Sequence, residues 1–221
     1  MVWPALEAFD AECAAFAERV SSVAVPDLDR ITNCPPWTLH ELVVHVTFSI
    51  TLPERLRPAP DGFEPRNAAD YYRRPERDTD TYRTENVDRM QSIAATVARD
   101  DAASRFLDAW KRAHATFLAH EQDERIAAGG MALTVDSFLV TRLMSVAAHG
   151  VDVVITLDEP AWTTASALAC LRPLLVDLLG AEPPASWTDQ DLLELGTGRR
   201  PLETADVEAL GEHAARFPLL S

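Results

Sequence analysis

Cysteine is scarce in this chain of 221 residues, and no two cysteines form a Cys-x-x-Cys pair. Three widely spaced cysteines, an odd number, are typical of free thiols in a reducing cytoplasm. They are Cys13, Cys34 and Cys170. The opening residues, MVWPALEAFDAEC, lack a basic start followed by an apolar stretch, so no signal peptide is expected. We therefore expect a cytoplasmic protein.

Positive charge is also in short supply, because 20 Lys and Arg residues stand against 35 Asp and Glu, for a net charge of −15. Nucleic acid and anionic lipid both attract concentrated Lys and Arg, so neither partner is expected. The most apolar segment, TRLMSVAAHGVDVVITL at 141–157, contains Arg142, His149 and Asp152, which would be costly in lipid. We expect a buried helix there and no membrane span.

Strand alternation is not convincing in any segment, and the sequence has no internal repeat, phosphate loop, dinucleotide fingerprint or Ser-His-Asp elbow. Apolar spacing of three and four dominates instead, which predicts an all-α fold. Four long helices are expected at about 4–24, 39–55, 84–121 and 135–158. We expect a four-helix bundle over residues 1–160, with a small helical extension over 161–221 packed on it.

Local signals refine these segments. Thr38 followed by Glu41 is a capping box, and Thr134 and Thr164 are expected to begin helices. The 84–121 segment is either one helix or two with a bend near RDDAAS, and AAGGMALT is expected to be a turn. The Pro- and Arg-rich stretch that ends near residue 80 is either a lid or rim over a site or a mobile surface excursion.

The 135–158 segment contains four polar residues at helical spacing. Arg142, Ser145, His149 and Asp152 are separated by three, four and three positions, so they form a stripe on one face. The rest of the segment is apolar almost all round, which indicates an enclosed helix. A buried polar group without a partner costs about 2–7 kcal/mol. The polar stripe therefore faces either an internal polar network or a cavity for a metal or ligand.

His45 lies on the 39–55 helix, at the border of its core face. Histidines on two helices can converge inside a bundle, and neutral imidazole is a common zinc ligand. His45 and His149 are therefore candidate metal ligands, although a lone histidine at a helix border is more often a packed core or rim residue. His40 precedes His45 by five positions and lies on another face, so it is not expected to be a co-ligand.

Two segments have the pattern of a known family. WTLHELVVHV at 37–46 contains a Trp-Thr…Leu-Val-x-His element, and TRLMSVAAHGVDVVITLDEP at 141–160 is similar to Arg-Leu-x-Glu-x-x-x-His-Gly-x-Asp-Leu. LGTGRRPL at 195–202 and the ending RFPLLS add C-terminal features. Together they resemble the mycothiol-dependent maleylpyruvate isomerase N-terminal domains of the DinB-like superfamily of four-helix metalloproteins.

The resemblance implies a bundle that holds a divalent metal, usually zinc, through two His and one Glu. It also implies that the metal activates mycothiol, a small-molecule thiol co-substrate. His45 matches the first histidine and His149 the last, but Ser145 stands at the Glu position. A hydroxyl is a poor zinc ligand and brings no negative charge. Three alternatives remain: Asp152 supplies the missing carboxylate, water or substrate fills the position, or the site is inactive.

Anionic substrates need a cationic clamp, and the sequence offers two candidate catalytic residues. Arg142 lies on the polar stripe itself, although it would also suit an internal ion pair with Asp152 or another carboxylate. Arg199 lies in a Gly-Arg element that the resemblance implies, although it would also suit an exposed loop.

Two functions are therefore considered. The first is a divalent-metal, mycothiol-dependent transferase or isomerase that acts on a small electrophilic substrate. The second is a non-catalytic protein on the same bundle, which binds a small ligand or a partner and has a degenerate metal site. A homodimer is compatible with either function.

Overall fold

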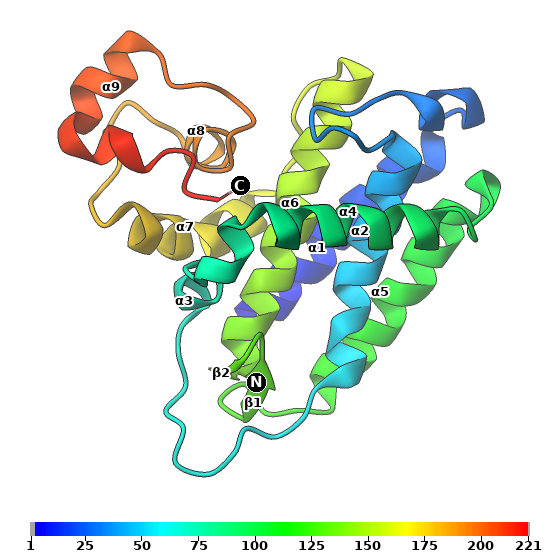
Figure 1. Cartoon of the computed structure of the whole chain (residues 1–221), viewed down its shortest axis with the longest axis horizontal. Coiled ribbons are helices and arrows are strands. Elements are labelled where there is room, and N and C mark those ends of the chain that lie inside the picture. Colours follow the sequence, from blue (N-terminus) through cyan, green and yellow to red (C-terminus); the bar gives the residue numbers. More distant parts are fainter. Residues whose placement is uncertain (1–2, 221) are drawn as a thin grey trace.

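The computed structural model describes residues 3–220, except for the side chain of Asp78. Four helices pack as a bundle in which α1 and α2 each contact both α5 and α6 (Figure 1). Their bounds are Pro4–Ser22 (α1), Leu39–Thr51 (α2), Ala102–Leu118 (α5) and Val135–Leu157 (α6). Large apolar side chains fill the core between them, among them Phe9, Phe16, Phe106 and Phe117, which are fully buried. The prediction of an all-α bundle is confirmed.

The expected capping signals begin the two helices that contain the histidines. The Thr38 side chain accepts a hydrogen bond from the Glu41 N–H, and the Glu41 carboxylate accepts one from the Thr38 N–H. The Thr134 hydroxyl accepts from the Ser137 N–H at the start of α6. Each cap satisfies N–H groups that no helical carbonyl can reach. Because the caps fix where α2 and α6 begin, they also fix which face of each helix presents its histidine.

The 84–121 segment forms two helices, α4 (Asp80–Ala94) and α5, joined through a 3-10 turn, η4 (Arg99–Asp101). Only α5 belongs to the bundle, because α4 packs on α2 and crosses the bundle from outside (Figure 1). The buried residues of α4 are only Met90 and Ala94, so α4 lacks the wide apolar face that a bundle helix needs. The expectation that the whole segment lies in the bundle was wrong for its first half.

A short antiparallel hairpin stands where only a turn was expected. Strand β1 (Arg125–Ala128) pairs with β2 (Met131–Thr134), and the two residues between them adopt positive φ angles, 58° at Gly129 and 78° at Gly130. A Gly-Gly pair suits a two-residue hairpin loop because that loop requires positive φ. With four residues each, the strands are too short to give an alternation that could be recognised in the sequence.

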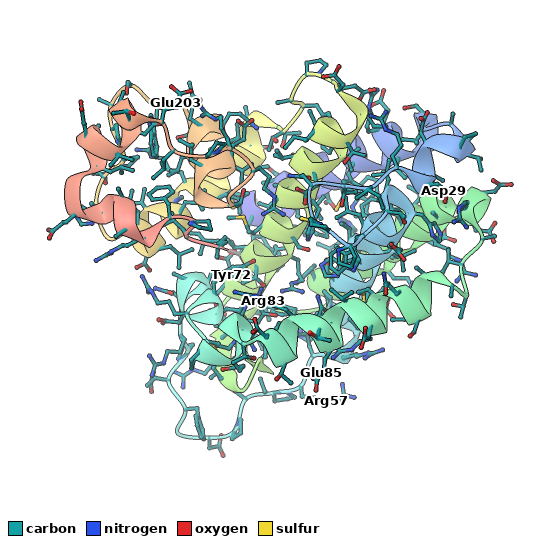
Figure 2. All side chains as sticks on the ribbon, turned by 45° about the horizontal axis from the view of Figure 1, so that its top comes forward. Asp29, Arg57, Tyr72, Arg83, Glu85 and Glu203 are labelled. Atoms are coloured by element: carbon teal, nitrogen blue, oxygen red, sulfur yellow. The ribbon has the colours of Figure 1, made fainter. Side chains whose placement is uncertain are left out.

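The Pro- and Arg-rich stretch before residue 80 is structured. It contains η2 (Leu52–Arg55), α3 (Ala68–Tyr72) and η3 (Pro75–Asp78). The Tyr72 hydroxyl donates to the Thr141 carbonyl of α6 at 3.0 Å, so Tyr72 lies where α3 meets α6 (Figure 2). Helix α3 is thereby held beside α6, as the rim alternative expects for this part of the stretch.

The C-terminal helices lie to one side of the bundle (Figure 1). The remaining elements are η1 (Val25–Asp29), α7 (Ala165–Leu179), α8 (Asp189–Gly196), α9 (Thr204–Leu210) and η5 (Gly211–Arg216). Helix α7 packs on α1 and α6, and α8 packs on α7. The Thr164 hydroxyl caps α7 as expected, and Gly180 ends it with a φ angle of 71°. The division of the chain at residue 160 stays a prediction.

Helix α6 is the central element of the fold. It is long and apolar enough to cross a membrane, but 78% of its most apolar 18-residue window is buried inside the protein. This burial agrees with the expectation of a core helix. The polar stripe therefore lies within the protein, where each of its residues needs a partner.

Candidate functional site

The two candidate histidines meet inside the bundle. His45 on α2 and His149 on α6 have ring centroids 4.9 Å apart, with their ring planes at 88°. The Trp37 ring lies beside both imidazoles, at centroid distances of 4.5 Å from His45 and 6.4 Å from His149. Burial, and after it the neighbouring His149 and arginines, lowers the pKa of His45 well below its usual value. His45 is therefore neutral near pH 7 and retains a lone pair for a ligand.

Asp152 holds His149 from one helical turn away. The Asp152 Oδ2 atom lies 2.8 Å from His149 Nδ1, and Arg199 donates to both carboxylate oxygens at 2.9 and 2.8 Å. Burial would raise the pKa of the Asp152 carboxyl, but the His149 hydrogen bond and the Arg199 charge outweigh burial and lower it below its usual value. The charged carboxylate accepts the Nδ1–H of His149, which leaves Nε2 as the nitrogen free to bind.

Arg199, and not Arg142, makes the ion pair with Asp152. Arg199 reaches the bundle from the turn after α8, and its side chain is only 11% exposed. The alternative of an exposed loop residue was therefore wrong, and so was the pairing of Arg142 with Asp152. Arg142 lies ten positions from Asp152 along α6, which is about 15 Å at roughly 1.5 Å per residue and beyond the reach of one side chain.

Cys34, which the sequence predicted only to be a free thiol, is a member of this cluster. Its thiol donates to Asp152 Oδ2 at 3.2 Å, and Arg199 Nη2 lies 3.6 Å from its sulfur. Burial and the Asp152 charge raise the pKa of the Cys34 thiol to about 12, so it remains protonated. Cys34 and Asp152 are 118 positions apart, and no local pattern in the sequence joins them.

The other half of the polar stripe contains no carboxylate. The Ser145 hydroxyl lies 2.9 Å from the Ser49 hydroxyl of α2. Arg142 is 4% exposed, and its Nη1 atom donates to the Ser49 carbonyl at 3.2 Å while its Nη2 donates to the Tyr71 hydroxyl at 3.2 Å. Tyr71 lies 71 positions from Arg142, so its contact with Arg142 is a further feature that spacing does not reveal.

The two imidazoles have the separation expected of ligands that share a divalent cation, but no unpaired carboxylate among the described residues lies beside them. Imidazoles that share a tetrahedral zinc ion have ring centroids about 5 Å apart, because each Zn–N bond is about 2.0–2.1 Å. The observed pair matches this separation. The Nδ1 atom of His45 is buried without a hydrogen-bond partner among residues 3–220, as expected of a nitrogen that binds an absent group. The residues therefore fit a loosely held cation with open coordination positions.

A second group of donors shares His149. One ligand atom each from Cys34, His149 and Asp152 lies within 4.8 Å of the others. The Arg199 guanidinium already donates to both Asp152 oxygens, so a positive charge already lies beside these three donors. A metal ion there would have to displace Arg199. Asp152 was predicted as a metal ligand, and its oxygens are engaged by Arg199 and His149 in this structure.

The chain has the all-α, DinB-like four-helix fold. The chain belongs to the mycothiol maleylpyruvate isomerase N-terminal domain family, whose sequence model matches residues 9–154. The resemblance seen in the two histidine-bearing segments is thereby confirmed.

Solved structures of low sequence identity share the fold. The crystal structure of a mycothiol-dependent maleylpyruvate isomerase is similar at 15% identity and a TM-score of 0.52, over 81% of this chain and 72% of that chain. A histidine-to-alanine mutant of such an isomerase gives 14% identity and a TM-score of 0.53 over the same shares. A comparison with curated proteins gives no match.

Proposed function

We propose that the protein is a divalent-metal, mycothiol-dependent isomerase or transferase that acts on a small electrophilic substrate. The observation that carries the proposal is the convergence of His45 and His149, 4.9 Å apart, inside the bundle. The family supports it, because the solved relative with this fold is a mycothiol-dependent isomerase. The free cysteines and the acidic composition agree with a cytoplasmic location, which we also propose.

We propose zinc as the metal, held by His45 and His149. A bound cation would supply acidity, because it lowers the pKa of a thiol and so provides the thiolate nucleophile. The protein's own groups prepare that position. Asp152 directs the free nitrogen of His149, and Arg199 in turn holds Asp152. We assign Asp152 and Arg199 to positioning, and Arg142 to binding of a negatively charged ligand.

A second function is favoured by one specific observation. The Ser145 hydroxyl is bonded to Ser49, where the family pattern has a carboxylate. Without that charge, a cation between the imidazoles is held less tightly. A non-catalytic protein that binds a small thiol or another ligand in the same bundle is therefore the alternative.

Turnover distinguishes the two functions. The full-length protein with added zinc or nickel is assayed with mycothiol, using maleylpyruvate and, separately, the general electrophile chlorodinitrobenzene. We expect mycothiol-dependent turnover that falls by at least about 100-fold in His45→Ala. His40→Ala is the matched control, because His40 is buried on the same helix but lies on another face.

Two results would overturn the enzymatic proposal. One is equal turnover by His45→Ala and the unmodified protein. The other is no turnover of either electrophile by the metal-supplemented protein, and mycothiol binding without turnover would then favour the second function.

A further inference from the structure

The Arg142 guanidinium is buried without a counter-ion. Arg142 is 4% exposed and forms no salt bridge with any carboxylate that the structure describes. It donates to three neutral acceptors, the Ser49 carbonyl and the hydroxyls of Tyr71 and Thr141, each at 3.2 Å. A guanidinium has five N–H groups, so two remain for another ligand. A buried charge that is hydrogen-bonded but not neutralised is costly, and an anionic ligand would remove that cost.

Two further arginines, Arg74 and Arg77, lie over the Tyr71 ring. The guanidinium of Arg74 lies 4.2 Å from the centroid of the Tyr71 ring, and that of Arg77 lies 5.5 Å from it. Arg77 also lies over Tyr72 and forms no salt bridge with a described carboxylate, while Arg74 has only the exposed Glu76 at 3.7 Å. Burial would raise the pKa of Tyr71, but Arg142, Arg74 and Arg77 outweigh burial and lower it.

This concentration of positive charge is unusual for a chain with a net charge of −15. Carboxylates are plentiful, and other arginines are paired with them, as in Arg73 with Asp177 and Arg112 with Glu54. Arg142 and Arg77 have no such pairing among the described side chains. Their positive charge is therefore available to a ligand that brings its own negative charge.

The arginines lie next to the imidazole pair. Arg142 lies seven positions before His149 on α6, about two helical turns, so the two side chains lie on one face of that helix. Ser49 joins the two regions, because its carbonyl accepts from Arg142 while its hydroxyl bonds Ser145. Along the polar stripe, Ser145 and His149 retain partial exposure between buried neighbours, so the stripe can be reached by solvent at these two positions.

We infer that Arg142, Arg77 and Tyr71 form a subsite for the oxyanion group of a small ligand, beside His45 and His149. A carboxylate and a phosphate share this chemistry, because either accepts two N–H groups of a guanidinium. The inference rests on the proposed function only in taking the oxyanion to be part of the substrate.

Calorimetric titration of the metal-free, full-length protein at low ionic strength tests the subsite. Succinate and inorganic phosphate are the two probes. We expect one of them to bind the unmodified protein, with affinity at least tenfold weaker in Arg77→Gln and in Arg142→Lys. Arg83→Gln is the control, because Arg83 lies on the exposed side of α4 next to Asp80 (Figure 2) and should leave the affinity unchanged. If Arg142→Lys does not fold, Arg77→Gln alone decides the test.

Binding of succinate alone would identify a carboxylic acid as the ligand class, and binding of phosphate alone a phosphorylated compound; both support the subsite. The inference is overturned if neither probe binds, or if Arg77→Gln binds the probe as tightly as Arg83→Gln. Because no metal, thiol or turnover is involved, the proposed function can fail while the subsite stands, and the reverse also holds.

Discussion

The hydroxyls of Ser145 and Ser49 lie 2.9 Å apart at the contact between α6 and α2, one turn of α6 before His149. Both groups of this pair are neutral. A cation between His45 and His149 would then have only neutral imidazole ligands from the protein. The affinity for the cation should therefore be set by the imidazoles alone and should respond to any carboxylate placed at position 145.

Ser145→Glu should raise the affinity for zinc at least tenfold, which corresponds to about 1.4 kcal/mol. The added carboxylate would project from the same face of α6 as His149. Zinc titration of the metal-free protein measures the effect. Ser104→Glu, at an exposed position on α5, controls for added negative charge. A folded Ser145→Glu variant with unchanged affinity would show that position 145 does not face the cation.

Asp152→Asn should destabilise the protein by about 3–5 kcal/mol, because it leaves the Arg199 charge buried and unpaired. Chemical denaturation gives the free energy of unfolding. Asp29→Asn is the control, since Asp29 pairs with Arg99 at the surface and should cost less than about 1 kcal/mol (Figure 2). Similar costs for the two variants would mean that the buried ion pair does not stabilise the fold.

Glu12 should give the stability a distinct dependence on pH. Its side chain is fully buried, and its Oε2 atom accepts hydrogen bonds from the N–H and hydroxyl of Thr164 at 2.9 and 2.8 Å. Burial raises the pKa of Glu12, although the Thr164 hydrogen bonds oppose the shift. Since the folded pKa exceeds the unfolded value of 4.5, the stabilising contribution is complete below about pH 4.5 and is lost as pH rises through the folded pKa.

Glu12→Gln removes this titration. The free energy of unfolding of the unmodified protein, relative to Glu12→Gln, should therefore fall as the pH rises from 4.5 towards 7. Denaturation at several pH values measures the difference. The exposed Glu7→Gln variant on the same helix should follow the unmodified protein at every pH. A constant difference between Glu12→Gln and the unmodified protein would contradict the role of burial.

Gly150→Ala should destabilise the protein by about 1–3 kcal/mol through overpacking. A Cβ atom at this position of α6 would lie 2.7 Å from Cη2 of the Trp162 ring, and the rigid indole would have to move. A double-mutant cycle with Trp162→Leu measures the coupling. The cost of Gly150→Ala should largely disappear in the Trp162→Leu background, and an equal cost in both backgrounds would contradict the close approach.

Local chemistry made some features predictable from the sequence. The Thr38–Glu41 capping box, the Thr134 cap and the faces on which His45 and His149 lie all depend on spacing within a single helix. Helical periodicity fixes such relations. The polar stripe on α6 was predictable for the same reason.

Other features depend on contacts between distant segments. Arg199 reaches Asp152 across 47 positions, and no periodicity relates the two residues. Cys34 joins the same cluster from a loop. The short hairpin at Gly129 and Gly130 and the exit of α4 from the bundle depend on how segments pack, and the sequence signal of each is weak.

Zinc titration of the metal-free protein, with His45→Ala and His149→Ala compared by calorimetry, tests most directly whether the two imidazoles share a cation. We expect the unmodified protein to bind one equivalent, and each variant to lose at least about 100-fold in affinity with little further loss in the double variant. A single imidazole cannot hold the ion, so the two losses should not add. Absence of zinc binding by the unmodified protein, or unchanged affinity in either variant, would contradict a shared cation.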